Sequence, residues 1–227
     1  MVKTIVTTET IKTIAERNGV EMYDVYTGFK WIANVMRENE GKKNYIGGGE
    51  ESYGFLCEDF VRDKDAVSAC VILAEIAAWA KDQGLSLYQL LQKIYVEYGF
   101  SKEKGISVVK KGKSGAEEIE AMMKKFRENP LTEIAGSKVT YFYDYSTLKG
   151  KDYAENETVT LDMPTTSNVL QYFTEDNTKV SIRPSGTEPK IKFYCEVHSK
   201  VKSIDELPEA EKAAEEKINQ IKASLGI

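Results

Sequence analysis

The 227-residue sequence predicts two domains, an α/β domain over residues 1–98 and an α+β domain over residues 99–227. In the first half, short apolar runs alternate with helical patterns, which is typical of a layered α/β domain. In the second half, one helical pattern, several alternating strand patterns and a closing helical pattern predict an antiparallel sheet packed with helices. The composition becomes rich in glycine and lysine after Gly99, and this change places the domain boundary.

The first domain opens with a predicted strand over residues 2–7 and a helix over residues 9–18. Thr8 is suited to cap this helix, and Gly19 is suited to end it in a left-handed conformation. Further strands are predicted at 20–26 and 44–47, and a further helix at 28–38.

Two more helices close the first domain. The pattern over residues 64–83 is apolar on most faces, which predicts a helix packed on several sides. Cys70 lies within this pattern and is therefore expected to be a buried thiol. The next helix starts after Ser86, where Gln89 three residues later completes a capping box, and Gly99 ends it.

The second domain alternates in the same way between recognisable helix and strand signals. Ser114 and Glu117 form a capping box for a helix that runs to Glu128, because Pro130 stops it. Strands are predicted at 105–110, 138–144, 157–163, 168–174, 178–183 and 190–197, and a final helix from Pro208 to Leu225.

The composition narrows the class of protein. No apolar run approaches the roughly 20 residues of a membrane span, and the N-terminus lacks a secretory signal. The net charge of −5 argues against a nucleic-acid partner. The three cysteines form no CxxC pair, and Cys195 also lies in an apolar pattern. We therefore expect a cytoplasmic protein without a membrane or nucleic-acid partner.

Residues 183–189, with the sequence Arg-Pro-Ser-Gly-Thr-Glu-Pro, join two predicted strands and have the features of an anion-binding loop. Gly186 lets the backbone turn and expose its N–H groups. Ser185 and Thr187 add hydroxyl donors. The Arg183 guanidinium matches phosphate oxygens in pairs. The loop is therefore a candidate phosphate site.

Lys192, two residues into the following strand, can add a point charge to this loop. The same residue types also form ordinary polar hairpin turns, so that interpretation stays open on the residues alone.

Two further segments are candidates for ligand contacts. Residues 47–54, Gly-Gly-Gly-Glu-Glu-Ser-Tyr-Gly, place carboxylates and a hydroxyl beside glycines that permit a close approach to a ligand. Lys30 lies in the first turn of a predicted helix, where the helix dipole disfavours a cation, so it can serve a ligand instead. A flexible acidic turn and a solvated lysine are the alternatives. One histidine and no Asp-rich cluster leave a metal site without support.

The order of these motifs resembles the α-D-phosphohexomutase superfamily, and most closely its phosphoglucomutase/phosphomannomutase branch. The motifs are residues 27–30 (TGFK), 49–54 (GEESYG) and 183–187 (RPSGT). The stretches 112–119 and 127–130 also resemble this branch, so the resemblance covers essentially the whole chain.

The resemblance implies a particular pair of domains. Family members have four domains around a cleft, and the first two carry a phosphoserine and a magnesium-binding loop. The sequence has no counterpart of those two motifs, so we expect the third and fourth domains alone. The third is an α/β domain with a mixed sheet. The fourth is a TBP-like α+β domain whose antiparallel sheet has helices on one face.

Roles are implied residue by residue. Glu50 and Ser52 resemble the residues that bind the 3- and 4-hydroxyls of the sugar, and Lys30 resembles the third-domain lysine of the active site. The shell around the phosphate that is not transferred corresponds to Arg183, Ser185, Gly186 and Thr187, with Lys192 where relatives often carry an arginine or lysine.

The implied reaction interconverts hexose 1-phosphate and hexose 6-phosphate, an isomerisation that passes through glucose 1,6-bisphosphate or its equivalent. Mg²⁺ would be bound by the N-terminal domains, which are expected partners together with the hexose phosphate. The fragment is then expected to supply binding but no catalytic residue, and to be inactive alone. A non-catalytic sugar-phosphate binding module shares every binding feature and remains the alternative.

Overall fold

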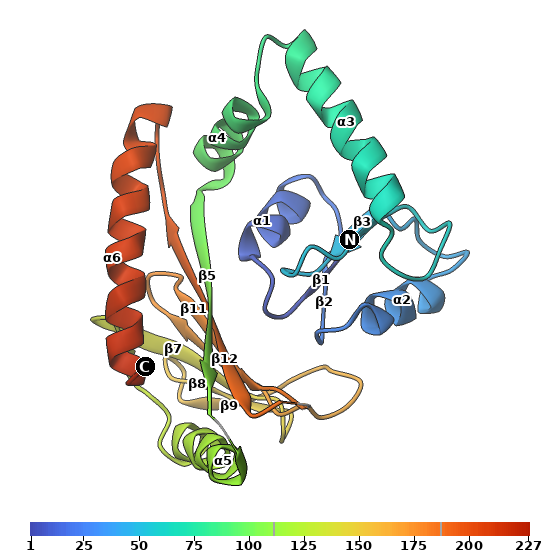
Figure 1. Ribbon diagram of the computed structural model, residues 1–227. Coiled ribbons are helices and arrows are strands. Elements are labelled where there is room, and N and C mark those ends of the chain that lie inside the picture. The colour runs from blue at the N-terminus through green and yellow to red at the C-terminus, as the bar shows by residue number, and fades with distance from the viewer. Residues whose placement is uncertain (111, 187) are drawn as a thin grey trace. The chain divides into compact units, whose positions relative to one another are not determined.

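A computed structural model describes residues 1–110, 112–186 and 188–227, which divide into two units (Figure 1). The first unit comprises Met1–Phe100 and Lys200–Leu207, and the second comprises Ser101–Ser199 and Pro208–Ile227. The sequence placed residues 200–207 in the second domain, whereas the structure groups them with the first unit. No helix in the described ranges combines the length and the apolar character that crossing a membrane would require.

The first unit is built on a four-stranded mixed sheet in the order β2-β1-β3-β4. Strand β1 is parallel to β2 and β3, and β4 is antiparallel to β3. The elements are β1 (Val2–Thr4), α1 (Glu9–Arg17), β2 (Tyr23–Val25), α2 (Phe29–Glu38), β3 (Gly47–Gly49), β4 (Phe55–Cys57), α3 (Ala66–Asp82) and α4 (Leu87–Tyr98). The predicted α/β class and mixed sheet are confirmed.

Helix α2 covers one face of this sheet. Its apolar side chains recur at helical spacing, so they share one face. Thr8 caps α1 by accepting a hydrogen bond from the Thr10 N–H at 3.2 Å, as predicted. Gly19 follows that helix with φ +67°, which is the predicted left-handed conformation. The core of the unit comprises Val2, Val25, Phe29, Ile32, Met36 and Leu56.

Helix α3 corrects one prediction. Its sequence is apolar on most faces, yet Val67 is 73% exposed and Val71 and Trp79 are each 54% exposed. Cys70 is exposed as well, so the expectation of a buried thiol is wrong. Ala80 is the buried residue of this helix. Figure 1 shows α3 running away from the small sheet, and apolar composition alone does not supply a neighbour to pack against.

The second unit contains an eight-stranded sheet whose main path is β5-β12-β11-β10-β7-β8-β9, with β6 paired to β7. Neighbouring strands from β12 to β9 are antiparallel, as predicted. The elements are β5 (Phe100–Val109), α5 (Gly112–Glu128), β6 (Glu133–Ile134), β7 (Ser137–Asp144), β8 (Lys149–Asp152), β9 (Glu157–Thr160), β10 (Leu170–Thr174), β11 (Lys179–Pro184), β12 (Lys190–Ser199), the 3₁₀ turn η1 (Ile204–Glu206, in the first unit) and α6 (Leu207–Leu225).

Helices α5 and α6 contribute to the core of this unit. The ring of Phe126 in α5 lies edge-on to Phe193 of β12, with centroids 6.3 Å apart. The Tyr172 hydroxyl donates to the Phe126 carbonyl at 3.0 Å, which ties β10 to the same helix. Helix α6 buries Ala214, Ile218, Ile221 and Leu225, which share one face.

Of the two capping boxes predicted from the sequence, one is present at the start of its helix and the other is not. The capping box of Ser86 and Gln89 is present with both hydrogen bonds. Helix α5 begins at Gly112, so Ser114 lies inside its first turn and the predicted capping box there is wrong. Strands β4, β6 and β8 had no sequence prediction.

Candidate functional site

The first group of predicted site residues lies at the carboxyl ends of the parallel strands. Residues 26–28 follow β2 and lead into α2, and residues 50–54 follow β3 and lead into β4. From β1 the chain continues to β2 on one side of β1, whereas β3 lies on the other side of β1. The border between β1 and β3 is therefore a topological switch point. The connections diverge there and leave a crevice that suits a ligand.

Glu50 connects two of these loops. Its Oε1 accepts a hydrogen bond from the Gly28 N–H at 2.7 Å, and its own N–H donates to the Gly54 carbonyl at 2.7 Å. Gly28 caps α2 with φ 110°, a conformation that favours glycine. The carboxylate is therefore held in place by the two loops that carry the first two predicted motifs.

Glu51 points in a different direction from its neighbour. Its Oε2 accepts a hydrogen bond from the Thr4 hydroxyl at 3.3 Å, and Thr4 is fully buried at the end of β1. The Thr4 and Thr7 hydroxyls lie 2.8 Å apart. The loop of residues 50–54, which follows β3, thus contacts Thr4 at the end of β1 through Glu51 and Gly28 in the segment after β2 through Glu50. The carboxylates of Glu50 and Glu51 therefore point in different directions. Ser52 follows in an exposed turn.

Two lysines lie against aromatic rings at this end of the sheet. The Lys30 ammonium is 5.0 Å from the ring centroid of Trp31, and the Lys64 ammonium is 5.9 Å from that of Phe29. Lys64 also contacts the Asp63 carboxylate at 3.2 Å. The sequence prediction missed Lys64, because it lies beyond the glycine-rich motif in a run of mixed charges that has no recognisable spacing.

Gly54 lies where the side chains of Glu50 and Lys64 approach each other, and its missing side chain leaves room for both. A Cβ at this position would lie 2.9 Å from Glu50 Oε2 and 3.2 Å from Lys64 Cδ. Both contacts are with flexible side-chain ends, so the substitution would move the side chains rather than the backbone.

The family resemblance implies a hexose phosphate as ligand, and with glucose 1-phosphate as the probe we expect Gly54→Ala to weaken this binding about fivefold, because it displaces Glu50 and Lys64 without removing them. The free energy of unfolding should stay within about 0.5 kcal/mol of the original value. Calorimetric titration and urea unfolding check the two parts. Gly105→Ala is a matched control, since a Cβ there meets nothing within 4 Å. Equal affinities for the two variants would contradict this arrangement.

The second group of predicted residues lies on the hairpin between β11 and β12. The Ser185 N–H donates to the Lys190 carbonyl at 2.8 Å, and the Glu188 N–H donates to the Ser185 hydroxyl at 3.3 Å. Gly186 lies in the turn, with nothing within 4 Å of a Cβ built on it. Thr187 falls outside the described residues.

Arg183 and Lys192 are directly opposite each other in the β11–β12 register, so their side chains share one face of the sheet. Both are partly exposed. Like charges in such a cross-strand pair repel. Within residues 1–110, 112–186 and 188–227, no carboxylate lies at ion-pair distance from either cation. An anion between them would relieve the repulsion.

Lys190 differs from these two cations, because it forms an ion pair with Glu188. The hydrogen bond from Lys190 and its charge lower the pKa of the Glu188 carboxyl. The charge of Lys192 also lowers this pKa, to a smaller extent than Lys190. Lys190 is therefore paired with Glu188, whereas Lys192 interacts with that carboxylate only at longer range and lies opposite Arg183.

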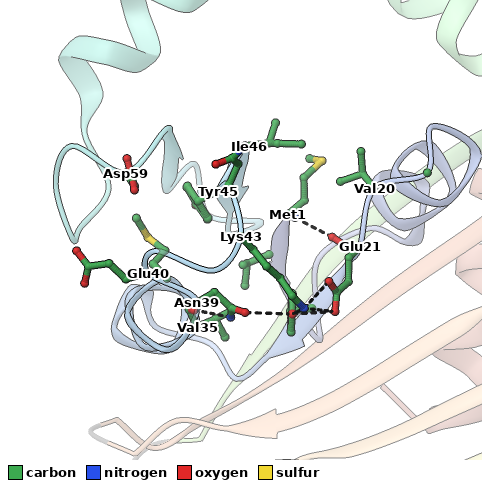
Figure 2. A pocket seen from close by; sticks show the side chains of 15 residues that line it. Met1, Val20, Glu21, Val35, Asn39, Glu40, Lys43, Tyr45, Ile46 and Asp59 are labelled. Atoms are coloured by element: carbon green, nitrogen blue, oxygen red, sulfur yellow. Dashed lines mark hydrogen bonds and ion pairs between the residues drawn. The ribbon is translucent and has the colours of Figure 1, made fainter.

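A cavity of about 290 Å³ lies elsewhere, at the amino ends of the parallel strands (Figure 2). It contains none of the predicted site residues. Two of its charged side chains are paired with each other, since Lys43 contacts the Glu21 carboxylate at 2.6 Å, and Lys43 also contacts the Tyr23 hydroxyl at 2.7 Å. Ligands of such sheets bind at the opposite, carboxyl edge, so this cavity is not the candidate site.

Comparison with known families adds to this geometry. Residues 1–98 match the family model described as phosphoglucomutase/phosphomannomutase, alpha/beta/alpha domain III. Residues 107–214 match the model for the C-terminal domain of the same family. The chain belongs to the phosphoglucomutase/phosphomannomutase family. The two matches follow in the order that the resemblance implied.

Curated relatives support the same family. A phosphoglucomutase of Staphylococcus aureus is 40% identical over 194 residues, which cover 86% of this chain and 35% of the relative. One of Staphylococcus haemolyticus is 36% identical over 198 residues, which cover 87% of this chain and 36% of the relative. The chain thus spans about a third of the length of these phosphoglucomutases.

Solved structures share the fold. The open form of pp63/parafusin, a phosphoglucomutase from Paramecium, superposes with a TM-score of 0.59 at 18% identity. That match covers 89% of this chain and 33% of the other. A putative phosphomannomutase from Thermus thermophilus gives a TM-score of 0.55 at 18% identity, covering 94% of this chain and 36% of the other.

Proposed function

We propose that this chain supplies the sugar-hydroxyl and phosphate contacts of a phosphoglucomutase/phosphomannomutase that interconverts hexose 1-phosphate and hexose 6-phosphate. The observation that carries the proposal is the facing pair of Arg183 and Lys192 beside the Ser185–Gly186 turn, in a chain of this family. Two cations and a turn of exposed backbone suit a dianionic phosphate.

The first unit would bind the sugar. Glu50 Oε1 is occupied by the Gly28 N–H, which leaves Oε2 on the side of Gly54 and Lys64. A carboxylate oxygen accepts a hydrogen bond from a sugar hydroxyl, and the Ser52 hydroxyl can donate or accept beside it. Lys30 would contribute a positive charge at the same end of the sheet.

The proposed intermediate, a sugar that carries two phosphates, must be held in either orientation during the reaction. A fixed phosphate clamp and paired hydroxyl contacts suit that requirement, because they hold one end of the sugar while the other end reacts. On this proposal Arg183, Ser185, Gly186 and Lys192 hold the phosphate that is not transferred. Thr187 would complete this shell.

The residues that the structure describes do not fit the Mg²⁺ site that the family implies. In the part of the chain that the structure describes, no three His, Cys, Asp or Glu side chains gather as a metal site would require. On this proposal, Mg²⁺ and the phosphoserine belong to other domains of the full-length enzyme, and this chain contributes ligand binding.

The test has two parts. Calorimetric titration of the chain with glucose 1-phosphate should show binding, and titration with inorganic phosphate, which carries the anion without the sugar, should show binding as well. A coupled mutase assay of the chain alone should show no turnover. Turnover would contradict the binding-only role, and absence of any binding would contradict the proposed contacts.

A matched pair of lysine variants locates the site. Lys30→Met should weaken binding of glucose 1-phosphate by about three- to tenfold, the scale of one exposed charged contact. Lys43→Met makes the same change at the cavity on the opposite edge of the sheet and should leave the affinity unchanged. If Lys43→Met has the larger effect, the ligand binds in that cavity instead.

A further inference from the structure

The turn that follows β1 holds two buried hydroxyls side by side. The Thr7 N–H donates to the Thr4 carbonyl at 2.9 Å, which closes a turn over residues 4–7. In this turn the hydroxyl oxygens of Thr4 and Thr7 lie 2.8 Å apart. Thr4 is 0% exposed and Thr7 is 5% exposed, so water has little access to either hydroxyl. Both hydroxyls must therefore form their hydrogen bonds within the protein.

Glu51 fixes the direction of the hydrogen bonds between these groups. An ionised carboxylate only accepts, so the Thr4 hydroxyl donates its single proton to Glu51 Oε2, at 3.3 Å. The Thr7 hydroxyl must then be the donor in its contact with Thr4. The hydrogen bonds therefore form a chain from Thr7 through Thr4 to Glu51, and the members of such a chain strengthen one another.

The loop of residues 50–54 has a backbone that needs this support. Tyr53 has φ 67°, in the left-handed region that a tyrosine rarely adopts, and such a conformation persists only where the surroundings hold it. Its own side chain is 99% exposed, so the packing of that side chain does not hold it. The Glu50 N–H closes the loop on the Gly54 carbonyl at 2.7 Å. The hydrogen bond between Glu51 and Thr4 then attaches the closed loop to the buried end of β1.

We propose that Thr4 and Glu51 are positioning residues for the sugar: they attach the loop to β1 and so hold Ser52 beside Glu50, where both can contact the hydroxyls of a hexose. Glu50 has a second attachment, because its Oε1 accepts from the Gly28 N–H at 2.7 Å. Ser52 lies in an exposed turn next to Glu51, and its place depends more on the attachment to Thr4. A loop that is already ordered loses less entropy when the sugar binds. This inference rests on the proposed function.

Two ligands separate this role from a general loss of structure. Thr4→Val removes the hydroxyl and should weaken binding of glucose 1-phosphate about two- to fivefold. The affinity for inorganic phosphate should not change, because the proposed function assigns phosphate to the hairpin of the second unit. Thr4→Ser keeps the hydroxyl and should restore most of the affinity for glucose 1-phosphate. An equal loss for both ligands, or no loss for either, would overturn the proposal.

A double-mutant cycle tests whether the two residues act together. Glu51→Leu should weaken binding of glucose 1-phosphate as much as Thr4→Val does, whereas Glu51→Gln keeps an oxygen that accepts and should stay near the wild type. In the Thr4→Val background, Glu51→Leu should have no further effect, since the contact is already lost. Losses that add would show independent roles and would contradict the proposal.

Thr178→Val is the matched control for the loss of a buried hydroxyl. Thr178 is also 0% exposed, but it lies in the second unit, just before β11 and at the opposite end of that strand from Arg183. This variant should leave the affinity for glucose 1-phosphate unchanged. A loss as large as that of Thr4→Val would show that the effect does not depend on the contact with Glu51.

Hydrogen exchange of the Glu50 amide observes the loop without any ligand. This N–H is bonded to the Gly54 carbonyl, and in Thr4→Val it should exchange several times faster than in the wild type, because the loop opens more often. Unchanged exchange would overturn the proposed attachment even if calorimetry still shows binding to the wild-type chain. If calorimetry shows no binding of glucose 1-phosphate to the wild type, the proposed function itself fails, whatever the exchange shows.

Discussion

Replacing Arg183 by alanine is expected to weaken the binding of glucose 1-phosphate by about 1.5–3 kcal/mol, which is about ten- to 150-fold in the dissociation constant. The guanidinium is directly opposite Lys192 across the β11–β12 hairpin, where it can contact a phosphate from one side while the lysine contacts it from the other. The alanine variant keeps Lys192, so the loss is that of the charge-assisted hydrogen bonds of the guanidinium alone. Calorimetric titration of the 227-residue chain measures it.

Two variants give this measurement its controls. Arg183→Lys keeps the charge but not the planar fork, so its affinity should lie between those of the wild type and the alanine variant. Arg37→Ala removes the same charge from the last turn of α2, where the guanidinium contacts Asn34 Oδ1 at 2.9 Å. It should leave the affinity unchanged. Equal affinities for Arg183→Ala and Arg37→Ala would contradict the phosphate assignment.

Replacing Glu196 by alanine should lower the free energy of unfolding of the second unit by about 3 kcal/mol. Glu196 is 3% exposed and Lys179 is 2% exposed, and Glu196 Oε2 lies 2.9 Å from the lysine ammonium. Glu196 Oε1 contacts His198 Nε2 at 2.8 Å. Removing the carboxylate between these groups leaves a buried ammonium without this partner. Urea unfolding followed by circular dichroism measures the change.

The same carboxylate predicts an effect of pH. Burial raises the pKa of Glu196. The hydrogen bond from His198 and the charge of the Lys179 ammonium together lower this pKa by more than burial raises it. The net pKa therefore lies well below the ordinary value of 4.5. Because the folded-state pKa is depressed, this contribution to stability is complete above about pH 4.5 and is lost as the pH falls below it. Glu196→Gln should therefore show a smaller loss of stability on acidification.

Glu157→Ala is the matched control for these stability measurements, since it removes the same side chain from the exposed strand β9. Its free energy of unfolding should change by less than about 0.5 kcal/mol. Similar losses for Glu157→Ala and Glu196→Ala would show that the buried carboxylate does not stabilise the sheet.

Much of the fold could be predicted because local chemistry decides it. Thr8 and Gly19 delimit α1 by a side-chain cap and a left-handed residue, and Ser86 with Gln89 starts α4 by a reciprocal pair of hydrogen bonds. These signals act within four residues, so a sequence displays them. The alternation of the antiparallel strands is also local, and it predicted the strands at 178–183 and 190–197, which the structure pairs as β11 and β12.

Packing could not be predicted in the same way. The exposure of α3 depends on which neighbours its apolar faces meet, and the pattern of Val67 and Val71 is the same with or without a neighbour. The contacts of Lys64 with the site, and of Glu51 with Thr4, join residues that are distant in sequence. Their residue types are common on any surface, so only the fold selects them.

The path of the chain between the two units has a consequence for proteolysis. The backbone passes from one unit to the other after Phe100, again after Ser199 and a third time after Leu207. A protease that cuts only near residue 100 would release neither unit, because residues 200–207 remain associated with the first unit while α6 belongs to the second. The larger fragment, residues 101–227, would then carry residues 200–207 of the first unit together with the second unit. Independent units would require cuts at all three crossings.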